Sequence, residues 1–170
     1  HTTLTPINNR PDYTSLKRMK KEIRTNLESV ATTLGGGQHG CIALILSNAT
    51  YALIAPHDPF IIPPHPGPIP TTYPPNTTAA TIASIHRVYQ ENLRLFREQS
   101  NLQLAVKKQI FAAIQPIYVK ALQDRASGFA NVTILQIITH LFTVYSAINI
   151  AEINANDARM KTPWDPNQPF

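Results

Sequence analysis

Apolar residues recur at steps of three and four in the first part of the chain. This spacing predicts an amphipathic helix over residues 14–34. Its apolar stripe consists of Leu16, Met19, Ile23, Leu27, Val30 and Leu34. Three glycines at 35–37 favour a helix end, because glycine adopts the positive φ of a C-terminal cap. The apolar run at 42–46 fits two elements equally well, a short helix over residues 41–46 that extends as far as 54, or a buried strand over residues 42–46.

A proline-rich segment follows. Nine of the fifteen prolines lie within residues 56–75, in the string PHDPFIIPPHPGPIPTTYPP. Proline lacks a backbone donor, so this density predicts an extended loop and excludes a regular helix or central strand. A domain boundary is one explanation for so long a loop. We favour a loop packed across a single domain, because it contains apolar anchors. These are Phe60, Ile61, Ile62, Ile69 and Tyr73.

Helical spacing returns after the loop. It predicts a helix over residues 78–99 and a second helix that begins with Asn101 as its cap and stops at Pro116. Residues 117–123 resume the same spacing, which predicts a further short helical stretch.

Two capping patterns mark the C-terminal part. Thr133 and Gln136 have the spacing of a capping box, which predicts a helix up to residue 145. A similar pattern beginning at Asn149 predicts a last helix over residues 150–160.

These patterns predict an all-α protein, a compact bundle of five to seven helices with one long proline-rich loop. The 170 residues suit a single hydrophobic core. We therefore expect one helical domain over residues 1–162, with the loop at 56–75 inside it. Residues 163–170, which are rich in proline, are expected to form a linker toward a second domain outside this sequence.

The composition suits a protein that packs against copies of itself. Charged residues make up 15% of the chain, against roughly 25% in typical globular proteins. The net charge of +5 is compatible with an anionic partner such as RNA. No apolar run reaches the roughly 18 residues that span a bilayer, so no membrane partner is expected. One cysteine, Cys41, excludes an intrachain disulfide and suggests a reducing, cytoplasmic location.

The sequence contains no recognisable catalytic or cofactor-binding pattern. The glycine-rich string LGGGQHG lacks the Lys-Ser or Lys-Thr of a phosphate-binding loop, and it follows a helix rather than a strand. His39 and Cys41 lack the further ligands that a zinc site needs. No nucleophile elbow or carboxylate pair is present. We therefore expect no enzyme activity, no cofactor, no metal and no small-molecule substrate.

Five cations lie within eight residues of the first predicted helix. They form a candidate RNA-contacting ridge. An ordinary solvated helix face explains them better, because no aromatic residues interleave to stack bases. The five are Lys17, Arg18, Lys20, Lys21 and Arg24.

Four phrases in order along the chain resemble the Gag-like region of copia-type LTR retrotransposons, in particular the diatom and protist branch. They are LGGGQHG, HPGP at 65–68, NVTILQIITHLFTVY, and NDARMKTPWDPNQPF at the end. The resemblance implies a helical domain like the N-terminal domain of retroviral capsids, which self-associates into virus-like particles around the element's RNA. Two positions depart from the family pattern, Ser146 in place of glycine and the cysteine at Cys41.

The phrase HPGPIP also resembles the exposed proline loop of some retroviral capsids, which binds a host prolyl isomerase. It marks His65, Pro66, Gly67 and Pro68 as a candidate contact, with the Gly67-Pro68 bond at its centre. The alternative to a shell-forming protein is a monomeric helical module that binds peptide or RNA, which includes a domesticated Gag relative.

Overall fold

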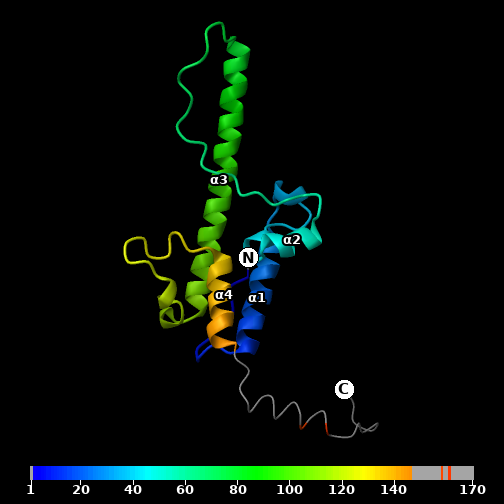
Figure 1. Ribbon diagram of the computed structural model, residues 1–170, viewed down its shortest axis with the longest axis vertical. Coiled ribbons are helices and arrows are strands. Elements are labelled where there is room, and N and C mark those ends of the chain that lie inside the picture. The colour runs from blue at the N-terminus through cyan, green and yellow to red at the C-terminus, as the bar shows by residue number, and fades with distance from the viewer. Residues whose placement is uncertain (1, 147–157, 159–160, 162–170) are drawn as a thin grey trace.

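The computed structural model describes residues 2–146, 158 and 161. Within them it contains four α-helices, four short 3-10 turns and one isolated bridge between Asp124 and Gly128 in place of any sheet. The helices are α1 (Tyr13–Glu28), α2 (Asn48–Ile54), α3 (Ala79–Ala113) and α4 (Ile134–Tyr145) (Figure 1). The 3-10 turns are η1 (Leu34–Gly36), η2 (Ile42–Ile45), η3 (Pro116–Tyr118) and η4 (Lys120–Leu122). The all-α prediction is confirmed for the described residues.

The hydrophobic core lies between α1, α4, η2 and the C-terminal half of α3. Each helix turns one apolar face inward, with Ile23, Ile110 and Ile137 fully buried on α1, α3 and α4. Burial of one such side chain contributes about 1.5–3 kcal/mol. The N-terminal segment closes one end of this core, because Leu4 and Ile7 are buried beside it. We refer to this part of the molecule as the body.

Helix α1 begins one residue before the predicted start and ends earlier than expected. The Asp12 side chain accepts a hydrogen bond from the Ser15 N–H at 2.7 Å, and the Asp12 N–H donates to the Ser15 hydroxyl at 3.0 Å. The helix stops at Glu28, so the predicted extension to residue 34 is wrong. The chain turns back instead, and the Cys41 N–H donates to the Leu27 carbonyl at 2.9 Å. This bond satisfies a carbonyl at the helix end.

The short helix predicted at 41–46 is present as the 3-10 turn η2 and not as a strand, and it does not continue to residue 54. The 3-10 turn η2 buries Ile42, Leu44 and Ile45, and the chain is extended at Leu46. Ser47 then caps α2 by accepting a hydrogen bond from the Thr50 N–H at 3.1 Å. Ser47 therefore separates the 3-10 turn η2 from helix α2.

Helix α3 is one continuous helix of 35 residues, so the predicted break at Asn101 is wrong. No glycine or proline interrupts it, and Gln99 and Leu102 on either side of the expected break pack toward the core. Continuation of the helix keeps both contacts. The helix ends at Ala113, and two residues separate it from Pro116.

The C-terminal elements follow the sequence closely. Both hydrogen bonds of the predicted capping box start α4, from the Gln136 N–H to Thr133 at 3.1 Å and from the Thr133 N–H to Gln136 at 2.7 Å. Residues 117–123 form the turns η3 and η4 rather than a longer helix. The helix predicted over residues 150–160 lies, apart from Ala158, outside the described residues. So does the linker predicted at 163–170.

The molecule is elongated, which corrects the prediction of a compact bundle. Figure 1 shows the N-terminal half of α3 projecting from the body with the proline-rich loop beside it. All the buried residues of α3 lie between Gln99 and Ala113, in its other half. We refer to residues 61–98, the loop and this half of α3, as the arm. Phe60 at the start of the loop packs against the core, and the rest of the loop is packed along one helix.

Candidate functional site

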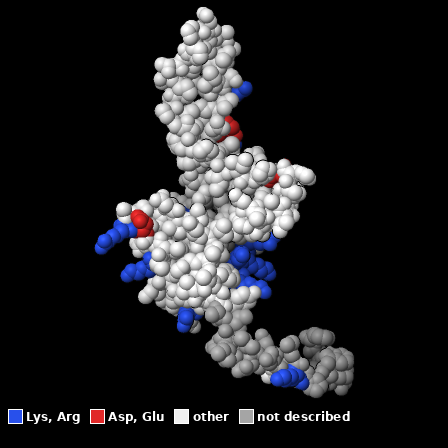
Figure 2. Space-filling view, viewed as in Figure 1, with Lys and Arg blue, Asp and Glu red and all other residues white. Residues whose placement is uncertain are grey.

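The cations predicted as an RNA-contacting ridge lie on the outside of α1. All five side chains are exposed, while the buried stripe of the same helix faces the core. Figure 2 shows Lys and Arg side chains gathered on the flank where Figure 1 places α1. Two of the five are partnered by carboxylates, Arg18 with Glu22 at 3.9 Å and Arg24 with Glu28 at 2.7 Å.

Two lysines of this ridge lie over aromatic rings. The Lys17 ammonium is 5.8 Å from the centre of the Tyr13 ring, and that of Lys20 is 5.6 Å from the Phe142 ring of α4. Such contacts are worth about 0.5–1 kcal/mol at exposed sites. One face of each ring therefore lies beneath a lysine of the ridge.

The predicted proline-loop contact lies on the arm, away from α1. The His65 ring packs edge-on against Phe96, with ring centres 4.9 Å apart. Tyr89 donates a hydrogen bond to the Gly67 carbonyl at 3.1 Å, and the Gly67 N–H donates to His65 at 3.0 Å. Pro66 and Gly67 are half-buried, whereas His65 and Pro68 are exposed. The loop is thus pinned to α3 at the Gly67-Pro68 bond.

A second anchor fixes the loop nearer its end. Tyr73 donates to the Pro70 carbonyl at 2.6 Å and also hydrogen-bonds His86 of α3. His86 is consequently half-buried beneath the loop. The loop is a fixed part of the arm.

The glycine-rich turn is filled by side chains. The Tyr51 hydroxyl donates to the Gly35 carbonyl at 3.2 Å, and the Asp58 carboxyl group lies against Gly36, 2.9 Å from where a Cβ would stand. A carboxylate at this position disfavours an anion. The turn therefore serves to pack η1 against α2, in agreement with the absence of a phosphate-binding motif.

Cys41 is fully buried, which lowers the reactivity of its thiol. Burial raises the pKa of the Cys41 thiol, and the Gln99 side-chain amide is 3.7 Å from its sulfur. The residues that the structure describes hold no group of three His, Cys, Asp or Glu suited to a metal ion. The side-chain oxygen of Gln99 is buried without a hydrogen-bond partner.

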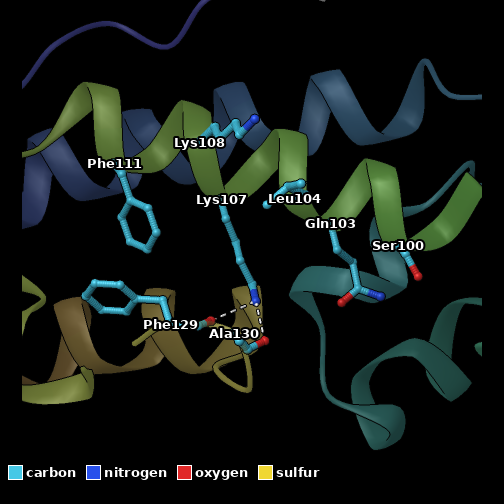
Figure 3. A pocket seen from close by; sticks show the side chains of 8 residues that line it. All are labelled: Ser100, Gln103, Leu104, Lys107, Lys108, Phe111, Phe129 and Ala130. Carbon is cyan, nitrogen blue, oxygen red and sulfur yellow. Dashed lines mark hydrogen bonds between the residues drawn. The ribbon is translucent and has the colours of Figure 1, made fainter. Parts of the chain in front are cut away.

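A pocket of about 490 Å³ lies between α3 and the loop that precedes α4 (Figure 3). Its α3 wall presents Ser100, Gln103, Leu104, Lys107, Lys108 and Phe111. Phe129 and Ala130 form the opposite wall. Figure 3 shows Lys107 crossing from α3 to this loop, where its ammonium donates to the Phe129 and Ala130 carbonyls at 3.1 and 3.2 Å.

The same pocket contains an aromatic pair and a partly desolvated cation. The Phe111 and Phe129 rings are tilted, with centres 4.7 Å apart. Burial lowers the pKa of Lys107. Within the described residues, no carboxylate lies within ion-pair distance of Lys107 or Lys108. Sequence reasoning missed this site. The spacing of Lys107 and Phe111 places them on one helix face, but nothing local indicates that Phe129 joins them.

A groove of about 340 Å³ separates α2 from the beginning of the proline-rich loop. Its lining is mainly apolar and carries no charged residue: Ala43, Asn48, Tyr51, Ala52, Ala55, Pro56, Pro59, Phe60, Ile61 and Ile62. Ile61 on its rim is 67% exposed. Leu53, also on α2, is 85% exposed. Large apolar side chains at this exposure indicate a contact surface where they gather.

Comparison of the chain with protein-family models, with curated proteins and with solved structures finds no match. Among the described residues, no helix has both the length and the apolar character needed to cross a membrane.

Proposed function

We propose that this chain is a structural, non-enzymatic Gag-like capsid domain. It self-associates into cytoplasmic virus-like particles that enclose retrotransposon RNA. The four phrases shared in order with copia-type Gag segments support this proposal, and so does the all-α fold. The observation that carries it is the uncharged apolar surface around α2, which offers copies of the chain a place to meet.

The distribution of charge favours a second copy at this surface. Residues 29–86 contain one charged residue, Asp58, and all fifteen Lys and Arg lie outside them. Copies with a net charge of +5 repel one another through their basic parts. Figure 2 shows few charged side chains over the upper part of the molecule. Electrostatic repulsion between two copies is therefore weakest where the surfaces formed by residues 29–86 meet.

The shape of this surface suggests how two copies fit. Asn48, Tyr51, Ala52 and Ala55 line the groove from one face of α2, as their spacing of three and four requires. Leu53 lies on the other face and projects into solvent. We propose that Leu53 of one copy enters the groove of the next.

This contact is head-to-tail, because the projecting leucine and the groove lie on opposite sides of the same helix. Head-to-tail contacts propagate from copy to copy, whereas a two-fold contact closes as a dimer. Burial of one leucine contributes only about 1.5–3 kcal/mol, so the contact is weak in isolation. Many such contacts in one shell would act together.

The test is sedimentation velocity of the chain over a wide range of concentration. The unmodified chain is expected to show a sedimentation coefficient that rises with concentration, and Ile61→Asp is expected to remain monomeric. Ile117→Asp is a matched control, because Ile117 on η3 is 68% exposed and lies outside the groove. Equal effects of the two aspartates, or a monomer at every concentration of the unmodified chain, would contradict the contact.

A monomeric module that binds RNA is the second candidate function. The exposed cations of α1 favour it, as does the pocket on α3. A chain that binds RNA and shows no association at any concentration would support this alternative.

A further inference from the structure

We infer that the pocket between α3 and the loop before α4 binds a nucleotide of single-stranded RNA. In this arrangement Lys107 contacts the phosphate, and the base packs against Phe111 and Phe129. This inference rests on one part of the proposed function, namely that the chain encloses RNA. It does not require self-association, since every group that it uses belongs to one chain.

The first support is the state of Lys107. An ammonium has three N–H donors, and the Phe129 and Ala130 carbonyls accept two of them. These two bonds fix the end of an otherwise flexible side chain at the wall of the pocket. The burial that lowers the pKa of Lys107 also makes its charge costly, and an anion placed at the third N–H would offset that cost.

The second support is the aromatic wall beside this cation. Phe111 follows Lys107 by one helical turn, so both project from the same face of α3. Phe129 joins them from the opposite wall, as Figure 3 shows. Proteins that bind single strands combine backbone-contacting cations with aromatic rings on which bases stack. On the α1 ridge a lysine lies over each of the two rings, whereas among the described residues no cation lies over the Phe111 or Phe129 ring.

The third support is the remaining lining. Ser100 and Gln103 provide uncharged donors and acceptors for base edges at the other end of the pocket. The volume of about 490 Å³ lies within the usual range for small-ligand sites, about 300–1,000 Å³. The net charge of +5 adds attraction for a polyanion. These features favour a nucleotide over an acidic peptide, which would leave the rings without a planar partner.

The experiment measures fluorescence anisotropy of a labelled single-stranded oligouridine at protein concentrations where the chain is monomeric. Lys107→Gln is expected to weaken binding roughly tenfold, the scale of one lost hydrogen bond between charged groups. Lys21→Gln removes the same charge from α1 and is expected to weaken it less than about twofold. Equal losses in the two variants would show sequence-blind attraction and overturn the pocket. A larger loss of affinity in Lys21→Gln than in Lys107→Gln would assign the RNA contact to α1.

Phe111→Leu tests the rings, because it removes the aromatic ring and leaves a smaller apolar side chain. It is expected to weaken binding of the single strand and to leave binding of a duplex of equal length unchanged, because paired bases cannot stack in the pocket. Equal affinity of the unmodified chain for both RNAs would overturn the proposal.

Crosslinking covers the case in which Lys107→Gln fails to fold. Photocrosslinking of 4-thiouridine RNA to the unmodified chain, mapped by mass spectrometry, is expected to label residues 100–111 or 129–130. Crosslinks confined to α1 would contradict a nucleotide site in the pocket. So would an acidic peptide that displaces the RNA from the pocket and binds more tightly. Because the chain is monomeric throughout, failure here leaves self-association standing.

Discussion

Gly35 and Gly67 share a left-handed backbone but differ in what surrounds them. Their φ angles are +57° and +79°. A Cβ at Gly35 would lie 2.3 Å from the Tyr51 hydroxyl, whereas a Cβ at Gly67 would meet no atom within 4 Å. Both the backbone conformation and the packing therefore require glycine at position 35. At position 67 only the backbone conformation requires it.

Alanine at each position separates these two effects. Gly67→Ala is expected to lower the free energy of unfolding by at most about 1–2 kcal/mol, the cost of a left-handed alanine. Gly35→Ala should cost roughly 1 kcal/mol more than that, since Tyr51 must move and lose its hydrogen bond. Urea denaturation of the two variants measures the difference. Equal losses would show that Tyr51 does not constrain the turn.

The ends of α1 and α4 illustrate what could be predicted from local sequence. Both N-terminal capping boxes use side chains within three residues of one another, so sequence spacing is sufficient to find the box at Thr133. The C-terminal end of α1 depends on Cys41, thirteen residues beyond Glu28, which turns back to cap it. Sequence spacing carries no signal for that contact.

The continuity of α3 could not be predicted for a similar reason. Asn101 after an amphipathic stretch has the appearance of an N-cap, and its neighbours Gln99 and Leu102 give no local sign of their burial. The packing of Gln99 and Leu102 against the body favours one continuous helix over two. Local preference is a weak guide where tertiary contacts compete with it.

Asn101→Ala distinguishes the two possibilities by the sign of its effect. Within a continuous helix, alanine replaces a poorer helix former at an exposed position and is expected to add a few tenths of a kcal/mol of stability, about 0.5 at most. If Asn101 capped a separate helix, the same change would cost about 1 kcal/mol. Thermal and urea unfolding, followed by circular dichroism, report which sign holds.

The projecting arm is the main departure of the whole molecule from the sequence prediction. Apolar spacing in residues 82–96 predicts a helix with a buried side, but it does not identify what covers that side. The proline-rich loop provides the cover, through His65, Tyr73 and the Gly67 carbonyl. A helix packed against a loop leaves the arm narrow and extended.

A distance measured along α3 tests this shape. Spin labels at Ser84→Cys and Ala112→Cys, both exposed positions, lie twenty-eight residues apart in one helix, or about 42 Å along its axis. Cys41 is fully buried and should not react with the label. Double electron–electron resonance is expected to give a single narrow distribution near that distance. A much shorter distance would mean that two helices fold back on one another in a compact bundle.

The candidate sites were predictable to different degrees. The cations of α1 and the prolines of the arm could be identified as runs in the sequence. The groove and the pocket could not, because each joins segments far apart in the chain, such as Ala43 with Ile62 and Lys107 with Phe129. Which segments meet depends on the turn after α1 and on the single long helix.

Mixing two variants tests self-association through the Leu53 groove most directly. Leu53→Asp removes the projecting side chain and Ile61→Asp blocks the groove, so each variant alone should remain monomeric. A mixture at high concentration still has one intact leucine and one intact groove, and sedimentation velocity should show dimers that do not grow further. Larger species or unmixed monomers in that mixture would contradict a head-to-tail contact.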